Sequence, residues 1–214
     1  MSKLWIIGDS FSAEFFHPKE GPNSYKNLYS KYKGYTPKFF GQIISERLNI
    51  DYQILPEGPN DNSRMLELFI DNMDKMKDGD ILSFGWTSTS RLSIVDCINN
   101  KWEIVNAGNM TGDFLHGIRV SSLVDFAINR DHILYIKQLI KWMKLIDRSV
   151  PNVKVIHWTW TNNTYFPFER IVDDTEGIID DIHWSEKGHE QFANWFLDVY
   201  NKKIENKCYE IWAH

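Results

Sequence analysis

Three polar residues near the two ends of the chain have the types and spacing that nucleophilic catalysis requires. Ser10 directly follows Gly8 and Asp9, and Asp180 precedes His183 by three positions. A serine hydroxyl is a weak nucleophile near neutral pH, and it becomes effective when an imidazole takes its proton. A carboxylate three residues from the histidine can accept Nδ1–H and leave Nε2 ready for that proton. These residue types predict acyl-transfer chemistry if folding brings the two ends of the chain together.

The residues before Ser10 predict the strand that positions it. Leu4 to Ile7 are apolar without alternation, which is typical of a strand buried on both faces of a sheet. Gly8 and Asp9 then favour a tight turn. Ser10 is therefore expected at the carboxyl end of a parallel strand, where open α/β sheets bind their ligands. Taken alone, the three residues Gly-Asp-Ser are equally compatible with a simple turn.

The rest of the chain alternates between strand and helix patterns. Strand patterns cover 51–55, 81–84 and 153–159, and helix patterns cover 36–49, 62–76, 131–148 and 185–201. Thr36-Pro37 predicts the N-cap and first residue of the first helix, and Asn62 or Ser63 is the expected cap of the second. This repetition predicts an α/β fold with a doubly wound parallel sheet. Between the third and fourth strands, 92–98 and 101–105 flank Asn99-Asn100 and predict a hairpin. The segments 13–35, 106–117 and 160–180 are expected to be mainly connections, the first with a short helix.

Composition and charge exclude several classes of protein. The 214 residues are 43% hydrophobic, which fits one domain spanning residues 1–214. The net charge is −5 and there is no Lys/Arg block, so nucleic acid is not an expected partner. No apolar run approaches the ~20 residues of a membrane span. The two cysteines, Cys97 and Cys208, suit a reducing compartment, and with no signal-peptide pattern a cytoplasmic protein is expected.

The blocks at the two chain ends resemble those of the SGNH (GDSL-type) hydrolase family. The matching residues are Gly8-Asp9-Ser10 and Asp180-x-x-His183, with Gly188-His189 as the continuation of the second block. The resemblance implies a three-layer α/β/α sandwich, SGNH/flavodoxin-like, with a central parallel sheet. It also implies ester hydrolysis with Ser10 as nucleophile, His183 as general base and Asp180 as the residue that orients it.

The resemblance further implies an oxyanion hole with three donors. Two are backbone N–H groups, those of Ser10 and Gly58. The third is an asparagine side chain after the third strand, and here Thr87 stands at that position. Either Thr87 donates in its place, or Asn60 or Asn62 does, or the enzyme is slow.

Together these features predict a serine esterase that cleaves a small acyl ester of a small molecule or glycan, for example an O-acetyl group on a carbohydrate. Trp86 and Trp184 are candidate substrate-binding residues beside Asn60 and Asn62, because exposed tryptophans stack on sugars. The alternative for any tryptophan is a place in the core, which is the more common one. No cofactor and no metal are expected. A divalent metal is the less favoured interpretation of a set of acids and histidines: Asp9, Asp180, Asp181, His183 and His189. The alternative function is a catalytically weak or inactive protein of the same fold that binds or assembles with a partner.

Overall fold

A four-stranded parallel sheet forms the centre of the computed structural model, which describes residues 2–15, 21–55, 60–89, 91–96, 101–105, 114–115, 118–119, 132–161 and 168–208. The strands are β1 (Lys3–Ile7), β2 (Asp51–Ile54), β3 (Ile81–Trp86) and β8 (Lys154–Thr159). Their order is β2-β1-β3-β8, and each neighbouring pair is parallel. The predicted α/β fold with a central parallel sheet is confirmed.

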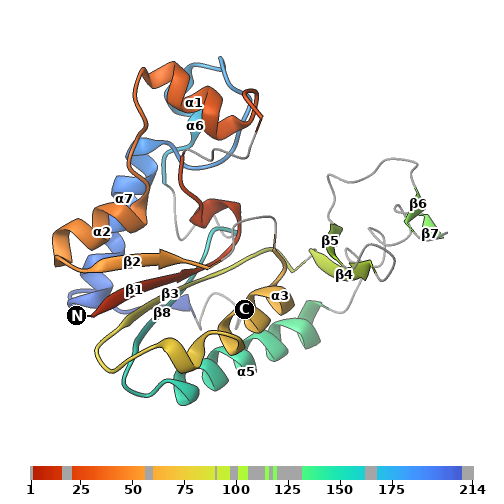
Figure 1. The fold of residues 1–214 in the computed structure, drawn as a ribbon, viewed down its shortest axis with the longest axis vertical. Helices are drawn as coiled ribbons and strands as arrows, with labels where there is room; N and C mark the ends of the chain where they lie inside the picture. Colours follow the sequence, from red (N-terminus) through yellow and green to blue (C-terminus); the bar gives the residue numbers. More distant parts are fainter. Residues whose placement is uncertain are drawn as a thin grey trace.

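Helices cover both faces of this sheet (Figure 1). One face carries α2 (Phe40–Leu48) and α7 (Glu186–Tyr200), and the other carries α3 (Asn62–Ile70) and α5 (His132–Ser149). Successive β1 residues point to opposite faces, so Leu4 and Ile6 join one buried cluster while Trp5 and Ile7 join the other. The unbroken apolar run of β1 is thus explained by a core on each side, which gives the three layers.

Two further helices lie side by side beyond the sheet (Figure 1), α1 (Tyr25–Lys33) and α6 (Ile171–Thr175). Tyr29 of α1 is buried and its hydroxyl hydrogen-bonds the Asp174 carboxylate of α6, which Lys33 also contacts at 2.8 Å. The short helix expected within 13–35 is therefore α1, and α6 lies within the segment that was expected to be a connection.

The remaining elements are short. The predicted hairpin is confirmed as an antiparallel pair, β4 (Leu92–Asp96) with β5 (Lys101–Val105), although its turn lies outside the described residues. A second pair, β6 (Phe114–Leu115) with β7 (Ile118–Arg119), was not predicted, and most of 106–117 is outside the described residues. Among the described residues there are also two single 3₁₀ turns, η1 (Ser10–Ser12) and η2 (Met73–Lys75).

Two helix starts differ from the sequence-based prediction. Helix α2 begins at Phe40, three residues after Pro37, because the Gln42 side chain accepts the Phe39 N–H at 3.1 Å and caps the helix there. Helix α3 is capped by Asp61, whose carboxylate accepts the Arg64 N–H at 2.8 Å. It ends at Ile70, so residues 71–76 are not part of it.

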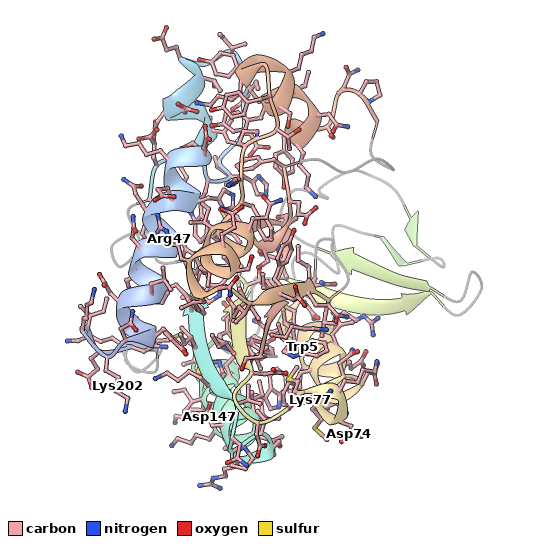
Figure 2. All side chains as sticks on the ribbon, turned by 60° about the vertical axis from the view of Figure 1, so that its left-hand side comes forward. Trp5, Arg47, Asp74, Lys77, Asp147 and Lys202 are labelled. Atoms are coloured by element: carbon pink, nitrogen blue, oxygen red, sulfur yellow. The ribbon has the colours of Figure 1, made fainter. Side chains whose placement is uncertain are left out.

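Asp80 ties the amino ends of the strands together. Its carboxylate accepts hydrogen bonds from the Lys3 N–H (2.8 Å), the Trp5 Nε1–H (2.8 Å) and the Lys77 N–H (3.0 Å). Figure 2 shows Trp5 and Lys77 close together at this edge of the sheet. Burial alone would raise the pKa of Asp80, but these donors and the charge of Lys3 lower it below its usual value. In the described part of the chain, no helix is long and apolar enough to cross a membrane.

Candidate active site

Ser10 and His183, which are 173 positions apart in the sequence, lie within hydrogen-bond distance of each other. The separation between Ser10 Oγ and His183 Nε2 is 2.7 Å. Ser10 opens η1 directly after the turn that ends β1. His183 comes just before α7, whose N-cap is Ser185, with a hydroxyl that accepts the Gly188 N–H at 3.1 Å. The end of β1 and the start of α7 thus meet at one point.

The carboxylate that partners His183 belongs to Asp181, and the predicted pairing with Asp180 is wrong. Asp181 Oδ1 bonds His183 Nδ1 and also accepts the His183 backbone N–H at 2.7 Å. Asp180 is exposed. The prediction assumed a helical turn over 180–183, but this segment is not helical, and α7 begins only at Glu186. The carboxylate instead folds back over the residue two positions later, as in an Asx turn.

This pairing fixes the proton positions in the site. An ionised carboxylate only accepts hydrogen bonds, so the Nδ1 of His183 carries a proton when it faces Asp181. Nε2 is then the acceptor, and the Ser10 hydroxyl donates to it. The side chains of His183 and Asp181 are only 19% and 14% exposed, so the pair is largely shielded from water. The arrangement is that of a serine, a base and an orienting acid.

Asp9 holds the turn that carries Ser10. It is a buried carboxylate that accepts four hydrogen bonds, from the Phe11 N–H (3.1 Å), the Thr87 hydroxyl (2.7 Å), Arg91 Nη1 (2.8 Å) and the Trp160 Nε1–H (2.6 Å). Phe11 belongs to η1, Thr87 and Trp160 directly follow β3 and β8, and Arg91 directly precedes β4. The carboxylate therefore fixes the position of the nucleophile turn against two neighbouring strands.

The residues predicted to donate to the oxyanion have different roles in the structure. The Thr87 hydroxyl has one proton, and it donates that proton to Asp9, so the structure does not support Thr87 as the third donor. Asn62 is fully buried, accepts the Thr87 N–H at 2.9 Å and donates to the Thr87 carbonyl at 3.1 Å, which is a structural role. Asn60 Nδ2 donates to the Gly8 carbonyl at 3.2 Å and so lies over the nucleophile turn. Gly58 lies outside the described residues.

One backbone donor remains at the serine itself. Ser10 is the first residue of η1, and the first N–H groups of a helix have no acceptor within it. The Ser10 N–H is therefore available to a negatively charged oxygen that forms next to Oγ.

The two predicted tryptophan contacts with substrate are wrong, because both rings are buried in the core. Trp86 is inaccessible to solvent and donates its Nε1–H to His157 Nδ1 at 3.2 Å. It lies on the same face of β3 as Phe84, against α3 and α5. Trp184 is 1% exposed and stacks on Phe192 of α7.

Sequence reasoning missed the rings that surround the histidine. Trp160, Phe11, His183 and Tyr25 form a continuous stack, here called the aromatic column. Successive centroids are 4.4, 4.6 and 4.2 Å apart, with interplanar angles of 16°, 31° and 7°. The Tyr25 hydroxyl also donates to the Ser10 carbonyl at 3.2 Å. The imidazole is thus held by its neighbours in the column as well as by Asp181.

Arg91 was missed as well. Its Nη1 bonds both Asp9 and, at 3.4 Å, the Asn60 carbonyl, and its guanidinium lies 5.4 Å from the Trp160 ring centroid. The sequence signal was only its position a few residues after β3. Among the described residues, no group of three or more His, Cys, Asp or Glu side chains is arranged to hold a metal ion.

Comparisons of the chain with protein-family models, with curated proteins and with solved structures find no match. The functional argument therefore depends on the geometry of Ser10, His183 and Asp181.

Proposed function

We propose that this chain is a serine esterase of the SGNH (GDSL) type that cleaves a small acyl ester. The observation that carries the proposal is the 2.7 Å contact between Ser10 Oγ and His183 Nε2, with Asp181 on the other ring nitrogen. Site geometry is a stronger guide to function than fold. The substrate class is a small-molecule or glycan ester, for example an O-acetyl group on a carbohydrate.

Acylation begins when Ser10 Oγ attacks the carbonyl carbon while His183 Nε2 takes the hydroxyl proton. Asp181 stabilises the imidazolium that forms. The carbonyl oxygen becomes an oxyanion and accepts the Ser10 N–H, with Asn60 as a second amide over the same turn. His183 then gives its proton to the departing alkoxide, which leaves as an alcohol. In the second half, His183 deprotonates a water molecule that attacks the acyl carbon. The bond from that carbon to Ser10 Oγ then breaks, Oγ takes the proton back from His183, and the acid is released.

The use of Thr87 by Asp9 favours a second candidate function. Removing one oxyanion donor from an esterase-like site costs about 2.7–4 kcal/mol in the barrier, or ~10²–10³ in rate. If Asn60 does not replace the missing asparagine donor, the chain is expected to be slow, and at the extreme it is a binding or assembly protein that retains the fold.

Covalent labelling separates the two functions. A fluorophosphonate probe is expected to label the wild-type chain and to leave Ser10→Ala unlabelled. Ser12→Ala is the matched control. Ser12 is a buried serine two positions after Ser10, and its hydroxyl has no hydrogen-bond partner among the described residues. It should be labelled like wild type and should hydrolyse p-nitrophenyl acetate at a similar rate.

Two outcomes oppose the esterase. Labelling that persists in Ser10→Ala would assign the reaction to another residue. A wild-type chain that is folded, is not labelled and does not hydrolyse p-nitrophenyl acetate above the Ser10→Ala background would support the binding protein.

A further inference from the structure

Tyr25 contacts both reacting residues of the candidate active site. Its ring lies nearly parallel to the His183 imidazole, with centroids 4.2 Å apart and an interplanar angle of 7°. Its hydroxyl donates a hydrogen bond to the Ser10 backbone carbonyl at 3.2 Å. A single side chain of α1 is therefore in contact with the base and with the residue that carries the nucleophile.

The imidazole of His183 has rings on its faces and hydrogen-bond partners at its edges. In the aromatic column, Tyr25 lies on one side of it and Phe11 on the other, with the Phe11 centroid 4.6 Å away. At the edges, Nδ1 faces Asp181 and Nε2 faces Ser10 Oγ at 2.7 Å. The hydrogen bonds set the direction of the two nitrogens, and the rings oppose a tilt of the imidazole out of that plane.

The rings also face the charge that forms during the proposed reaction. His183 becomes an imidazolium when it takes the proton of Ser10. The face of an aromatic ring is the negative part of its quadrupole, so the faces of Tyr25 and Phe11 attract this cation. Because the charge is absent before the proton is transferred, the attraction acts on the transition state more than on the bound substrate.

Helix α1 is attached to the start of α7, and this attachment sets the position of the Tyr25 ring. Tyr25, Tyr29 and Lys33 are spaced by four residues and so share one face of α1. The Tyr29 hydroxyl accepts the Glu186 N–H at 2.9 Å and donates to the Asp174 carboxylate. Lys33 contacts the same carboxylate at 2.8 Å. The face of α1 that carries Tyr25 is thus bound to the first residue of α7 and to α6.

We propose that Tyr25 is a positioning residue of the active site, whose ring holds the imidazole of His183 in the orientation that accepts the Ser10 proton. This inference rests on the proposed esterase activity and adds a residue to it. The proton transfers stay with Ser10 and His183, and Tyr25 acts through the histidine. Because Tyr25 binds no part of the substrate in this scheme, loss of its ring should lower kcat and leave KM unchanged.

Three substitutions separate the ring of Tyr25 from its hydroxyl, with p-nitrophenyl acetate as substrate. Tyr25→Leu and Tyr25→Met remove the ring but keep apolar volume, and both should lower kcat by about thirtyfold or more and change KM by less than about twofold. Tyr25→Phe keeps the ring and loses one neutral hydrogen bond, so its kcat should fall by less than about fivefold. Equal losses in all three variants would assign the effect to the hydroxyl and overturn the inference.

A double-mutant cycle tests whether Tyr25 acts through His183. The variant His183→Ala should keep a small residual rate, because substrate binding and the oxyanion donors remain. Adding Tyr25→Leu to it should change this residual rate by less than about twofold, since there is no imidazole left to hold. If Tyr25→Leu lowers the rate by the same factor in both backgrounds, its effect is a general structural one and the inference is wrong.

The matched control is Tyr32→Leu. Tyr32 is an exposed tyrosine of the same helix, and its hydroxyl donates to the Asp174 carbonyl at 3.2 Å, so its loss should leave kcat and KM within about twofold of wild type. Urea denaturation shows that each variant is folded under the assay conditions. A wild-type chain that hydrolyses the acetate no faster than a folded Tyr25→Leu overturns the inference alone. Failure of the wild-type chain to hydrolyse the acetate or to react with the fluorophosphonate probe overturns both proposals.

Discussion

At the scale of single residues, the adjacent Asp180 and Asp181 have opposite environments. Asp181 is mostly shielded and contacts both His183 Nδ1 and the His183 N–H, whereas Asp180 is exposed. A pair of residues with the same charge and nearly the same position in the sequence thus offers an internal control for the role of the carboxylate.

Replacing each aspartate by asparagine should separate their roles. In Asp181→Asn the amide can face Nδ1 with either its oxygen or its NH2 group. Some molecules then carry the His183 proton on Nε2, which can no longer accept the proton of the Ser10 hydroxyl. A drop in kcat/KM of about 10³–10⁴ is expected, with p-nitrophenyl acetate as substrate. Asp180→Asn should stay within about twofold of wild type. Equal losses in the two variants would argue against Asp181 as the orienting acid.

The start of helix α7 shows how one element positions several site residues. The Ser185 N–H donates to the Glu169 carbonyl at 3.1 Å, and the Ser185 hydroxyl caps the helix. Gly188 lies against the same carbonyl, so closely that an added Cβ would overlap it. The close approach keeps the backbone next to Arg170 against the loop that carries His183.

Gly188→Ala should therefore be destabilising, although alanine favours a helix over glycine by about 1 kcal/mol. The overlap with Glu169 is with backbone, which cannot rotate away, and a loss of about 1–3 kcal/mol is expected. Urea denaturation measures the change. Gly21→Ala is the control, because nothing lies within 4 Å of an added Cβ there and its free energy of unfolding should not fall. If Gly188→Ala has the same urea midpoint as wild type, α7 can move away from the Glu169 carbonyl without loss of stability.

Much of the architecture could be predicted from local patterns. The unbroken apolar run of β1 requires two buried faces, and α7 lies where the helix pattern over 185–201 predicted a helix. The start of α2 could not be predicted, because Thr36-Pro37 is a good helix start by itself and the Gln42 cap at Phe39 competes with it. Where two local helix-start signals are of similar strength, packing decides which of them begins the helix.

The site could be predicted only where sequence spacing determines geometry. The meeting of Ser10 with His183 was expected from their places at strand and helix ends, and their side chains do meet. The choice between Asp180 and Asp181 depends on backbone angles in a non-helical turn, which spacing does not give. The burial of Trp86 could have been predicted from the sequence, because alternation along β3 puts its side chain on the same face as that of Phe84.

At the scale of the whole molecule, a buried histidine links the stability of the core to pH. His189 is 4% exposed, accepts the Phe40 N–H at 3.3 Å through Nδ1, and packs edge-on against Phe15. Burial lowers the pKa of His189 to about 3, and a positive charge on His183 acts in the same direction. The unfolded chain has the usual value near 6.5. Between these two values the unfolded state binds more protons, so the contribution of neutral His189 is complete above pH ~6.5 and is lost as the pH falls.

The free energy of unfolding should consequently drop by about 2 kcal/mol from this residue between pH 7 and pH 5, at 1.36 kcal/mol per pH unit below 6.5. Urea titrations at the two pH values measure the drop. His189→Asn keeps an acceptor for the Phe40 N–H but does not titrate, so it should be less stable at pH 7 and have a shallower pH dependence. A variant with the wild-type slope would show that other groups cause the acid sensitivity.

The distance along the chain between Ser10 and His183 has a consequence for protein synthesis. A ribosome makes the hydroxyl first and the imidazole 173 residues later. Throughout that interval the nascent serine has no proton acceptor from the far end of the chain, and strand β8, which joins the sheet beside β3, is made only shortly before the histidine. If the chain is the proposed esterase, the growing polypeptide is therefore expected to be inert towards esters until His183 and α7 have been made.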